Sequence, residues 1–550
     1  MPTRSSVPPP TLPPSPAESQ PGAAARPGRV LLVLSFTAVL IWMDATVLAV
    51  ALERLADPRR GLGASPGDLQ WAVGAYSLTF ATVLFVSGAL GDRRGHRTIL
   101  AAGIVTFGAA SVWAAWSPTA LQLILARGLM GAGGAMIMPS SMAILAASFP
   151  PEKRAAAIGT FSASSGVGLA CGPMLGGALI DHFWWGSVFL INVPVVVIAL
   201  IGVRAVVPPT ASAASRRLDL VGIALSTAGL LLLAYGLIEG GQAGGWDRGR
   251  VWGSLAGGVA VLAAFVVTEL RQAEPSFDPR LFADRRFAAG NIALGAMFLA
   301  MAGQSFYSSF YLQGARGMSP WTAGLLSLPA ALGVVVGAPT GARLVRRFGF
   351  PAIAAPALGL LGGATALNAL FTAGTPLAVF CLVGAVAGVG GGATVAPTTA
   401  AVIASLPPAR IGAGSAVNNT VRQVGSLLGV AVLGTVLATA YRRGIGPSLT
   451  GLPPAERALA QPSAEATRRV ALTAGRPRLL DAANDAFMHA MHVTALCAGG
   501  IALAGALGLA LAFRSARASA GPAPAAGPGQ PVAPGPAAQP TPVPTPGRIG

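Results

Sequence analysis

The sequence has 550 residues, with 37 Lys and Arg against 19 Asp and Glu, so its formal net charge is +18. Charged residues make up 10% of the chain and hydrophobic residues 53%, whereas a soluble domain carries roughly 25% charged residues. Because apolar runs long enough to cross a bilayer recur throughout, this composition excludes a soluble enzyme, a nucleic-acid-binding protein and a disordered protein. It predicts an all-α, polytopic membrane protein.

Fourteen apolar runs lie between two tails that cannot bury a core. A helix that crosses the hydrocarbon needs about 20 residues, and runs of this length occur near 30–52, 69–90, 98–117, 119–147, 155–180, 186–207, 218–238, 251–270, 287–312, 321–342, 351–373, 376–402, 411–440 and 487–513. Residues 1–28 and 515–550 are mixtures of Pro, Ala, Gly and Ser, which predicts disordered tails. The first run is too long for a signal peptide and Asp44 interrupts it, so an uncleaved first helix is expected.

The positions of arginine predict how the chain crosses the membrane, since cytoplasmic loops carry an excess of basic residues. With the N-terminus inside the cell, the short inside loops hold more basic residues than the short outside loops; Arg93, Arg94 and Arg97 stand in the first inside loop. The long 441–486 loop is then extracytoplasmic, and an even number of spans returns the C-terminus to the cytoplasm. We therefore expect a multi-pass protein of the inner (cytoplasmic) membrane with both tails in the cytoplasm.

Three charged residues remain deep inside the predicted spans: Asp44, Arg127 and Arg422. A charge at mid-span costs about 3 kcal/mol on insertion scales, so intramembrane charges mark functional sites. At about 1.5 Å of rise per residue, Asp44 and Arg127 lie at similar depth in the outer half of the membrane, and Arg422 lies near the midplane. The first two can therefore pair, and the arginine would hold the aspartate ionised. The alternative is an ion pair that only fixes the helix register.

Several sequence motifs resemble those of the major facilitator superfamily. Gly88-Ala-Leu-Gly-Asp92-Arg93-Arg94-Gly95-His96-Arg97 resembles the loop after its second span. Three further motifs resemble its drug–proton antiporters: Leu125-Ala-Arg127-Gly-Leu-Met-Gly131-Ala-Gly133 in span 4, Gly168-Leu-Ala-Cys-Gly172-Pro173-Met-Leu-Gly176-Gly177 in span 5, and the fourteen-spanner signature from Trp42 to Leu52 in span 1. The similarity extends over about residues 30–513, nearly everything but the tails.

This resemblance implies the major facilitator fold, with two six-helix halves and two inserted helices. We expect the halves at residues 29–207 and 276–514 and the insertion at 208–275. The resemblance implies proton coupling by Asp44 and Arg127. It assigns a conformational latch to Gly88, Asp92, Arg93, Gly95 and Arg97, and the antiporter motif to Gly168, Gly172, Pro173, Gly176 and Gly177. The substrate cavity is expected to include Trp42, Asp44, Gln304, Tyr307, Asn418, Asn419 and Arg422.

Alternating access would rock the two halves around a midplane cavity. Small residues recur at three- and four-residue steps in span 5: Gly159, Ala163, Gly166, Ala170, Pro173 and Gly177. They predict a helix face that is nearly free of side chains. This face would form a sliding contact or, alternatively, a static one. Asp92 is expected to bind the start of span 13, near Gly412–Ser415, in the outward-facing state, because helix N-termini attract carboxylates. The second copy of the loop motif has Arg346 where aspartate would stand, so an internal duplication is indicated but a symmetric latch is not.

The leading prediction is a proton-coupled antiporter that exports a hydrophobic or monocationic small molecule, such as a drug or antibiotic. The resemblance implies that dications fit poorly, because branch members specialised for dicationic compounds look to need additional acids and spans 9–12 contain none. The alternatives are a facilitator or importer of a small solute and a non-transporting membrane sensor. The sequence has no Ser/His/Asp set, metal cluster or phosphate-binding loop, so an enzyme is not expected. We expect no cofactor or metal, transport driven by the proton motive force, and a monomer whose partners are the substrate, protons and the lipid bilayer, with no nucleic acid.

Overall fold

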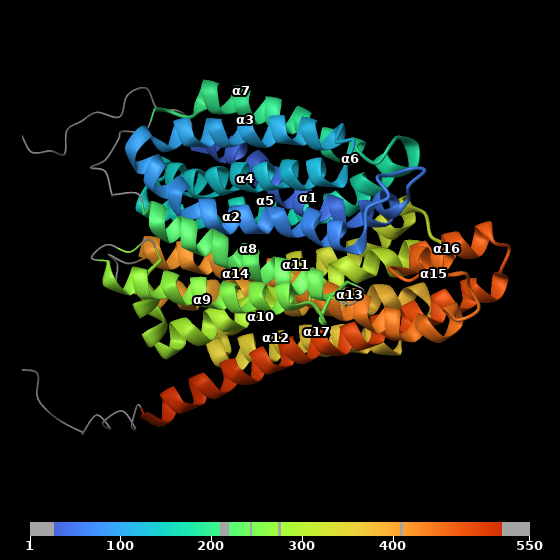
Figure 1. Ribbon diagram of the computed structural model, residues 1–550. Coiled ribbons are helices and arrows are strands. Elements are labelled where there is room, and N and C mark those ends of the chain that lie inside the picture. The colour runs from blue at the N-terminus through green and yellow to red at the C-terminus, as the bar shows by residue number, and fades with distance from the viewer. Residues whose placement is uncertain are drawn as a thin grey trace, which may run out of the picture.

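The structure is a computed structural model, and it describes residues 27–209, 219–242, 245–272, 275, 277–406 and 411–519. These residues form a bundle of long helices that run roughly side by side (Figure 1). Within the described ranges, 14 helices are long and apolar enough to cross a membrane. The predicted all-helical class and the predicted number of spans are therefore confirmed.

The spans fall into three sets along the chain. The first set is α1 (Pro27–Ala56), α2 (Pro66–Arg94), α3 (His96–Ala115), α4 (Ala120–Ser148), α5 (Pro151–His182) and the pair α6 (Ser187–Leu190) and α7 (Asn192–Val206). The inserted set is α8 (Leu220–Gly240) and α9 (Gly249–Arg271). The last set is α10 (Arg285–Ser309) with the π-helix η3 (Phe310–Ala315), α11 (Pro320–Phe348), α12 (Phe350–Leu367) with η4 (Asn368–Leu370), α13 (Leu377–Ala404), α14 (Ile411–Ile445) and α17 (Pro477–Ser519).

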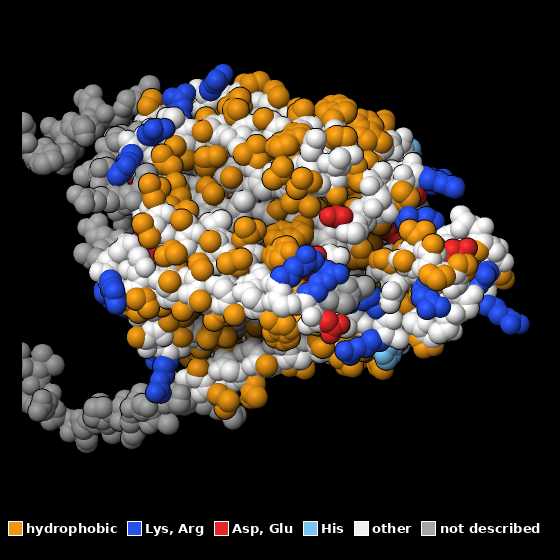
Figure 2. All heavy atoms as spheres, in the orientation of Figure 1, with side chains coloured by type: hydrophobic (Ala, Val, Ile, Leu, Met, Phe, Trp, Pro, Cys, Tyr) orange, Lys and Arg blue, Asp and Glu red, His pale blue; other side chains and the backbone are white. Residues whose placement is uncertain are grey.

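Apolar side chains cover the flanks of the bundle. Figure 2 shows hydrophobic side chains spread over the visible flank, with basic side chains mostly toward its ends. Large apolar side chains such as Val105, Val259 and Leu382 are exposed on the helices. A helix satisfies its backbone hydrogen bonds internally, which lets such surfaces face lipid.

Two predicted boundaries differ from the structure. α1 begins at Pro27 and α17 continues to Ser519, so residues 27–28 and 515–519, which were expected in the tails, are helical. Proline is tolerated in the first turn of a helix, and Ala and Arg extend α17 readily. The other tail residues lie outside the described ranges. The predicted 441–486 loop holds the ends of α14 and α17 and two short helices, α15 (Pro454–Ala460) and α16 (Ala464–Thr473). α16 is capped by the Ser463 hydroxyl, which accepts a hydrogen bond from Ala466 N–H.

The same tight turn occurs once in each half. Gly95 separates α2 from α3 with a φ of 86°, and Gly349 separates α11 from α12 with a φ of 84°. Glycine adopts such positive φ angles at little cost, whereas other residues do not. Both glycines belong to copies of the loop motif, so the backbone supports the internal duplication that the sequence indicated.

The two ends of the bundle differ in how the halves meet. We call the end where α1 begins at Pro27 the proximal face, and the end where α1 finishes at Ala56 the distal face. Between the halves, α5 packs against α11 and α2 packs against α14. Near the distal face, Gly177 lies against the backbone of Pro320, and Gly324 lies against the carbonyl of Pro173. A Cβ at either glycine would overlap a backbone oxygen, so this close approach requires glycine.

Polar contacts also join the halves at the distal face. Asp181, at the end of α5, accepts a 3.0 Å hydrogen bond from Trp321 N–H at the start of α11. The side-chain amide of Gln313 in η3 donates to the carbonyl of Val50 at 2.8 Å. Toward the proximal face, residues 152–154 and 158–160 of α5 and residues 343–344 and 346–348 of α11 are exposed. The molecule is therefore closed at the distal face, whereas the proximal ends of α5 and α11 are exposed.

The inserted helices lie beside the contact between the halves. α8 packs against α9, α2 and α14. Leu230 and Ala234 of α8 share a buried cluster with Leu78 of α2 and Leu427 of α14. The hydroxyl of Thr435 in α14 adds a 2.7 Å hydrogen bond to the carbonyl of Leu237 in α8. The insertion thus contacts both halves on one flank of the α2–α14 contact.

Replacing Gly324 by valine should open the distal face. The new Cβ would overlap the Pro173 carbonyl, a backbone group that cannot rotate away. Overpacking of this kind costs about 1–3 kcal/mol, which corresponds to a roughly 5- to 150-fold change in a two-state equilibrium. Electron–electron resonance between spin labels at the exposed positions 183 and 325 should then gain a longer distance component.

The labels require a cysteine-free background, in which Cys171, Cys381 and Cys497 are replaced. Gly359→Val in α12 is the matched control, because nothing lies within 4 Å of a Cβ built at Gly359. An unchanged distance distribution in Gly324→Val, or an equal change in the control, would show that this contact does not hold the distal face closed.

Candidate functional site

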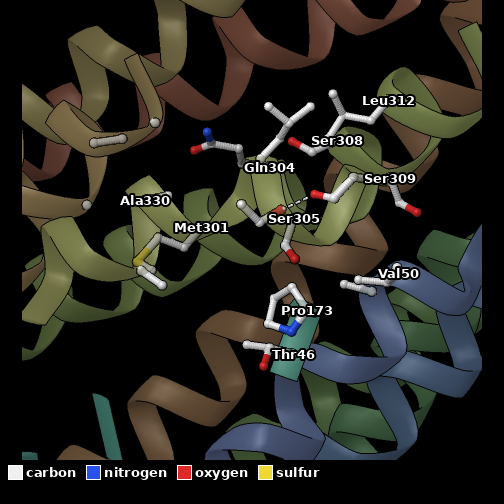
Figure 3. Close-up of a pocket in the computed structure, with 18 of the residues that line it drawn as sticks. Thr46, Val50, Pro173, Met301, Gln304, Ser305, Ser308, Ser309, Leu312 and Ala330 are labelled. Carbon is white, nitrogen blue, oxygen red and sulfur yellow. Dashed lines mark hydrogen bonds between the residues drawn. The ribbon is translucent and has the colours of Figure 1, made fainter. Parts of the chain in front are cut away.

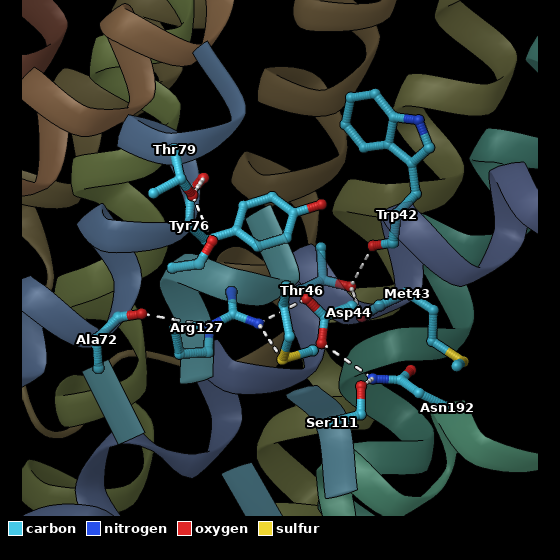
Figure 4. Close-up of polar contacts among 12 residues, drawn as sticks. Trp42, Met43, Asp44, Thr46, Ala72, Tyr76, Thr79, Ser111, Arg127 and Asn192 are labelled. Atoms are coloured by element: carbon cyan, nitrogen blue, oxygen red, sulfur yellow. Dashed lines mark hydrogen bonds and ion pairs between the residues drawn. The ribbon is translucent and has the colours of Figure 1, made fainter. Parts of the chain in front are cut away.

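A buried ion pair joins α1 to α4. Arg127 Nη1 donates to Asp44 Oδ2 at 2.6 Å, and the two side chains are 2% and 0% exposed. The sequence placed these two residues at similar depth in the membrane, and the fold brings them into contact (Figure 4). Removing one partner of a buried ion pair costs about 3–5 kcal/mol, because the other charge is left without a partner. The pair therefore ties α1 firmly to α4.

Neutral groups from two other helices complete the surroundings of the pair. Asn192 Nδ2, at the start of α7, donates to Asp44 Oδ1 at 3.1 Å. Arg127 Nε donates to the carbonyl of Ala72 in α2, and its guanidinium lies 4.7 Å from the centroid of the Tyr76 ring. Each oxygen of the Asp44 carboxylate therefore accepts a hydrogen bond. The Arg127 guanidinium donates to Asp44 and to Ala72 and lies near the Tyr76 ring.

A cavity of about 200 Å³ lies between the two halves (Figure 3). α1 and α5 form its wall from the first half, and α10 to α13 with η3 and η4 form its wall from the second half. None of the described residues that line it carries a charge. Its polar groups are amides and hydroxyls, contributed by Thr46, Gln304, Ser305, Ser308, Ser309, Gln313, Ser327 and Asn368. The lining suits an apolar molecule with a few hydrogen-bonding groups.

The ion pair and the cavity lie on opposite sides of α1. Thr46 lines the cavity, and it follows Asp44 by two residues, which turn a helix by about 200°. Asp44 therefore faces the interior of the first half and not the cavity. α1 therefore carries the Asp44 carboxylate on one side and forms part of the cavity wall with its other side.

The antiporter motif of α5 also has two faces. Three glycines at four-residue steps pack against α1 beside the ion pair: Gly168, Gly172 and Gly176. Gly172 lies against the carbonyl of Met43, the residue before Asp44. Pro173 and Gly177 face α11, and Pro173 lines the cavity. The motif thus links the segment that carries Asp44 to the second half.

The small-residue face predicted for α5 lies partly against α11. Gly166 meets Val335 of α11, and Gly177 meets the start of α11. Gly159, nearer the proximal face, has nothing within 4 Å of a built Cβ. Whether the contact slides stays a prediction.

Four of the residues predicted for the substrate cavity lie on α1 or α10, and the structure places them differently with respect to the cavity. Gln304 lines the cavity. Tyr307 is buried, and its hydroxyl accepts a 3.0 Å hydrogen bond from Asn368, so it supports the lining. Trp42 lies one turn before Thr46 on the same side of α1. Asp44, as described above, faces away.

The other three predicted cavity residues are on α14. Asn418 is buried and donates to Asn291 Oδ1 of α10 at 3.2 Å. Asn419 donates to a carbonyl of its own helix, that of Ser415. The guanidinium of Arg422 lies 4.8 Å from the centroid of the Phe298 ring. None of these three belongs to the lining of the cavity described above.

The predicted latch residues lie at the proximal turn between α2 and α3. Asp92 Oδ1 lies 3.3 Å from His96 Nε2, and the aspartate side chain is about half exposed. Arg97 donates to the carbonyl of Arg204 near the end of α7. Gly95 makes the turn, Arg93 follows Asp92 at the end of α2, and nothing lies within 4 Å of a Cβ built at Gly88. Contact between Asp92 and the start of α14 in the proximal-closed state stays a prediction.

Sequence reasoning missed three residues that the structure places at these sites. Asn192 is a lone amide in an apolar run, and this isolation was a signal that could have marked it as a partner for Asp44. Asp181 is an acid at a span end, and nothing in the sequence distinguishes it from an ordinary interfacial residue. Gln313 carries no pattern that would indicate its bond to Val50.

Comparison with known proteins places these features in a family. The chain is 33% identical over 423 residues to the tetracenomycin C resistance and export protein of Streptomyces glaucescens, which covers 76% of this chain and 77% of that protein. It is 32% identical over 494 residues to the multidrug efflux pump LfrA of Mycolicibacterium smegmatis, and this match covers 88% of this chain and 97% of LfrA. It is 32% identical over 487 residues to the methyl viologen resistance protein SmvA of Salmonella typhimurium, which covers 86% and 95%.

Solved structures show the same fold. A bacterial homolog to the human lysosomal transporter Spinster, in an inward-facing and unoccupied conformation, superposes with a TM-score of 0.62 at 18% identity, covering 89% of this chain and 97% of that one. The family model for the Major Facilitator Superfamily matches residues 34–430. With fourteen membrane-spanning helices in its described part, the chain is a multi-pass membrane protein that belongs to the major facilitator superfamily.

Proposed function

We propose that this protein is a proton-coupled antiporter that exports a drug-like hydrophobic small molecule by alternating access. The observation that carries the proposal is the buried Asp44–Arg127 pair on the helix whose opposite side lines the cavity between the halves. Relatives named for the export of tetracenomycin C, for multidrug efflux and for methyl viologen resistance support export. In this proposal the proximal face is cytoplasmic, the membrane is the inner membrane, and the protein works as a monomer.

Coupling would follow from the two sides of α1. A proton on Asp44 removes the charge that attracts Arg127, so the tie between α1 and α4 weakens. α1 packs on Gly168, Gly172 and Gly176, so a shift of α1 moves α5. α5 in turn meets α11 at the distal face. Protonation would thereby change the relative free energies of the two conformations, which is what exchange of a proton for a substrate requires.

Substitution of Asp44 by asparagine should abolish proton-coupled efflux. The amide keeps the shape of the side chain but cannot titrate, so a transported substrate should no longer dissipate a pH gradient across everted vesicles. Asp57→Asn is the control, because Asp57 lies in the distal turn after α1, where it accepts a hydrogen bond from Arg59 N–H. Well-expressed Asp44→Asn with normal coupling would place the proton site elsewhere and refute this assignment.

Loss of the arginine should change the pH dependence of transport. In Arg127→Ala the Asp44 carboxylate has lost its cationic partner, so the neutral carboxyl is favoured and proton release slows. The profile of substrate–proton exchange in proteoliposomes should move to higher pH. Arg127→Lys keeps the charge but loses the planar fork, so partial activity is expected.

Breaking the ion pair also lowers stability, by about 3–5 kcal/mol, so the lysine variant keeps the test meaningful if the alanine variant folds poorly. Asp44→Asn combined with Arg127→Ala should be no less active than Asp44→Asn alone, since the coupled unit is already broken. A pH profile that stays in place in a folded Arg127 variant would mean that the two residues do not act together.

Asp181→Asn and Asp92→Asn should shift the conformational equilibrium in opposite directions. Asp181 binds the N-terminus of α11 at the distal face, and Asp92 is proposed to bind the N-terminus of α14 when the proximal face is closed. Each such carboxylate contributes about 0.3–1 kcal/mol when exposed, so the shifts should be a few-fold. Spin labels at positions 183 and 325 should report more distal opening for Asp181→Asn and less for Asp92→Asn. Shifts of the same sign would contradict the paired-latch proposal.

A further inference from the structure

Arg422 is a cation inside the membrane whose partner is an aromatic ring. Its guanidinium lies over Phe298 of α10 at 4.8 Å, and none of the acidic residues in the described part of the chain forms an ion pair with it. The side chain is only partly exposed and lies deep within the bundle. An arginine cannot give up its proton in a protein, so Arg422 stays charged and is not itself a proton carrier. Burying a permanent cation costs free energy unless an anion compensates its charge.

The side of α14 that carries Arg422 faces the space between the halves. Val424, two residues later, packs with Leu78 of α2 and Leu230 of α8 on the flank of the inserted helices. Two residues turn a helix by about 200°, so Arg422 points away from that flank. Gly425, on a third side, packs against α10. Arg422 therefore lies between α10 and α2, toward the interior.

Phe298 continues the wall of the cavity toward the proximal face. Phe298, Met301, Ser305 and Ser308 follow one another at steps of three, four and three residues, so they share one face of α10, and the last three line the cavity. Seven residues separate Phe298 from Ser305, which places the ring and Arg422 roughly 10 Å nearer the proximal face. A molecule that enters the cavity from the proximal side passes this position.

We infer that the guanidinium of Arg422 binds the acidic group of an amphiphilic, monoanionic substrate whose apolar body occupies the cavity. This inference rests on the proposed export function and names the substrate class for it. A carboxylate or an ionised phenol supplies the negative charge that Arg422 lacks, and a guanidinium binds such oxygens through paired, charge-assisted hydrogen bonds. The uncharged cavity lining suits the remainder of the molecule.

The charge arrangement favours an organic anion over an organic cation. A cationic substrate would need a free carboxylate, but Asp44 is held by Arg127 and Asn192 and faces away from the cavity. An anionic substrate, by contrast, would not have to displace a carboxylate from Arg422. On the side of α1 that faces the cavity, one turn before Thr46, the indole N–H of Trp42 is buried without an acceptor and offers a second donor at similar depth.

The test compares three probes with the same tricyclic body: 2-anthracenecarboxylate, its neutral carboxamide and the cationic 2-(aminomethyl)anthracene. Binding to full-length protein in phosphatidylcholine nanodiscs is followed by fluorescence anisotropy. The wild type should bind the carboxylate about tenfold or more tightly than the amide, as expected for a hydrogen bond to a charged group. In Arg422→Gln this preference should fall to about one, with the amide affinity within a factor of about two of wild type, and Arg422→Lys should keep a part of the preference.

Arg347→Gln is the matched control, because Arg347 also lies over an aromatic ring, Phe348 at 5.2 Å, but at the exposed proximal end of α11. It should keep the full preference. A wild type that binds the amide or the amine as tightly as the carboxylate, or a preference that survives in Arg422→Gln, overturns the inference. Efflux of the neutral amide from proteoliposomes separates the two proposals. If the amide is exported without a carboxylate preference, only the inference fails, and if no probe is exported, the proposed function fails too.

Discussion

The ion pair between Asp44 and Arg127 is the interaction on which the rest of the arrangement depends. Breaking a buried ion pair by removing one partner costs about 3–5 kcal/mol, so the charged pair opposes separation of α1 from α4. Asn192 and Tyr76 extend this constraint to α7 and α2. The ionised pair and its partners therefore hold α1, α2, α4 and α7 of the first half together.

The second half contributes a different kind of surface. Its helices form most of the cavity with amides, hydroxyls and small apolar groups and no charged lining residue among those described. The first half thus holds the titratable group and the second half holds the space for a solute, with α1 and α5 between them. This separation means that the cavity lining can change without any change at the Asp44–Arg127 pair.

The helical class and the number of spans could be predicted because the length and hydropathy of each apolar run are properties of the chain itself. The Asp44–Arg127 contact could also be predicted, since the rise of a helix is fixed and depth follows from counting residues. The direction of a side chain around its helix could not be predicted in the same way, and this is why Asp44 was expected in the cavity although Thr46 lines it. Asp181 and Gln313 act through contacts between halves that are far apart in sequence, so they leave no local pattern. The extent of α17 was underestimated because hydropathy ends at the apolar run whereas helical propensity continues beyond it.

The distal contact between α5 and α11 is made largely of backbone atoms, since Gly177 and Gly324 bring the two helices together without intervening side chains. Such a contact immobilises few rotamers when it forms, so it costs little side-chain conformational entropy. Elsewhere at the distal face, apolar side chains of both halves share one buried cluster, in which Leu55 and Leu69 lie with Phe306 and Tyr441. Opening the distal face would expose part of this cluster to water and so raise the heat capacity. The temperature dependence of the equilibrium should therefore come from the apolar cluster and not from the glycine contact.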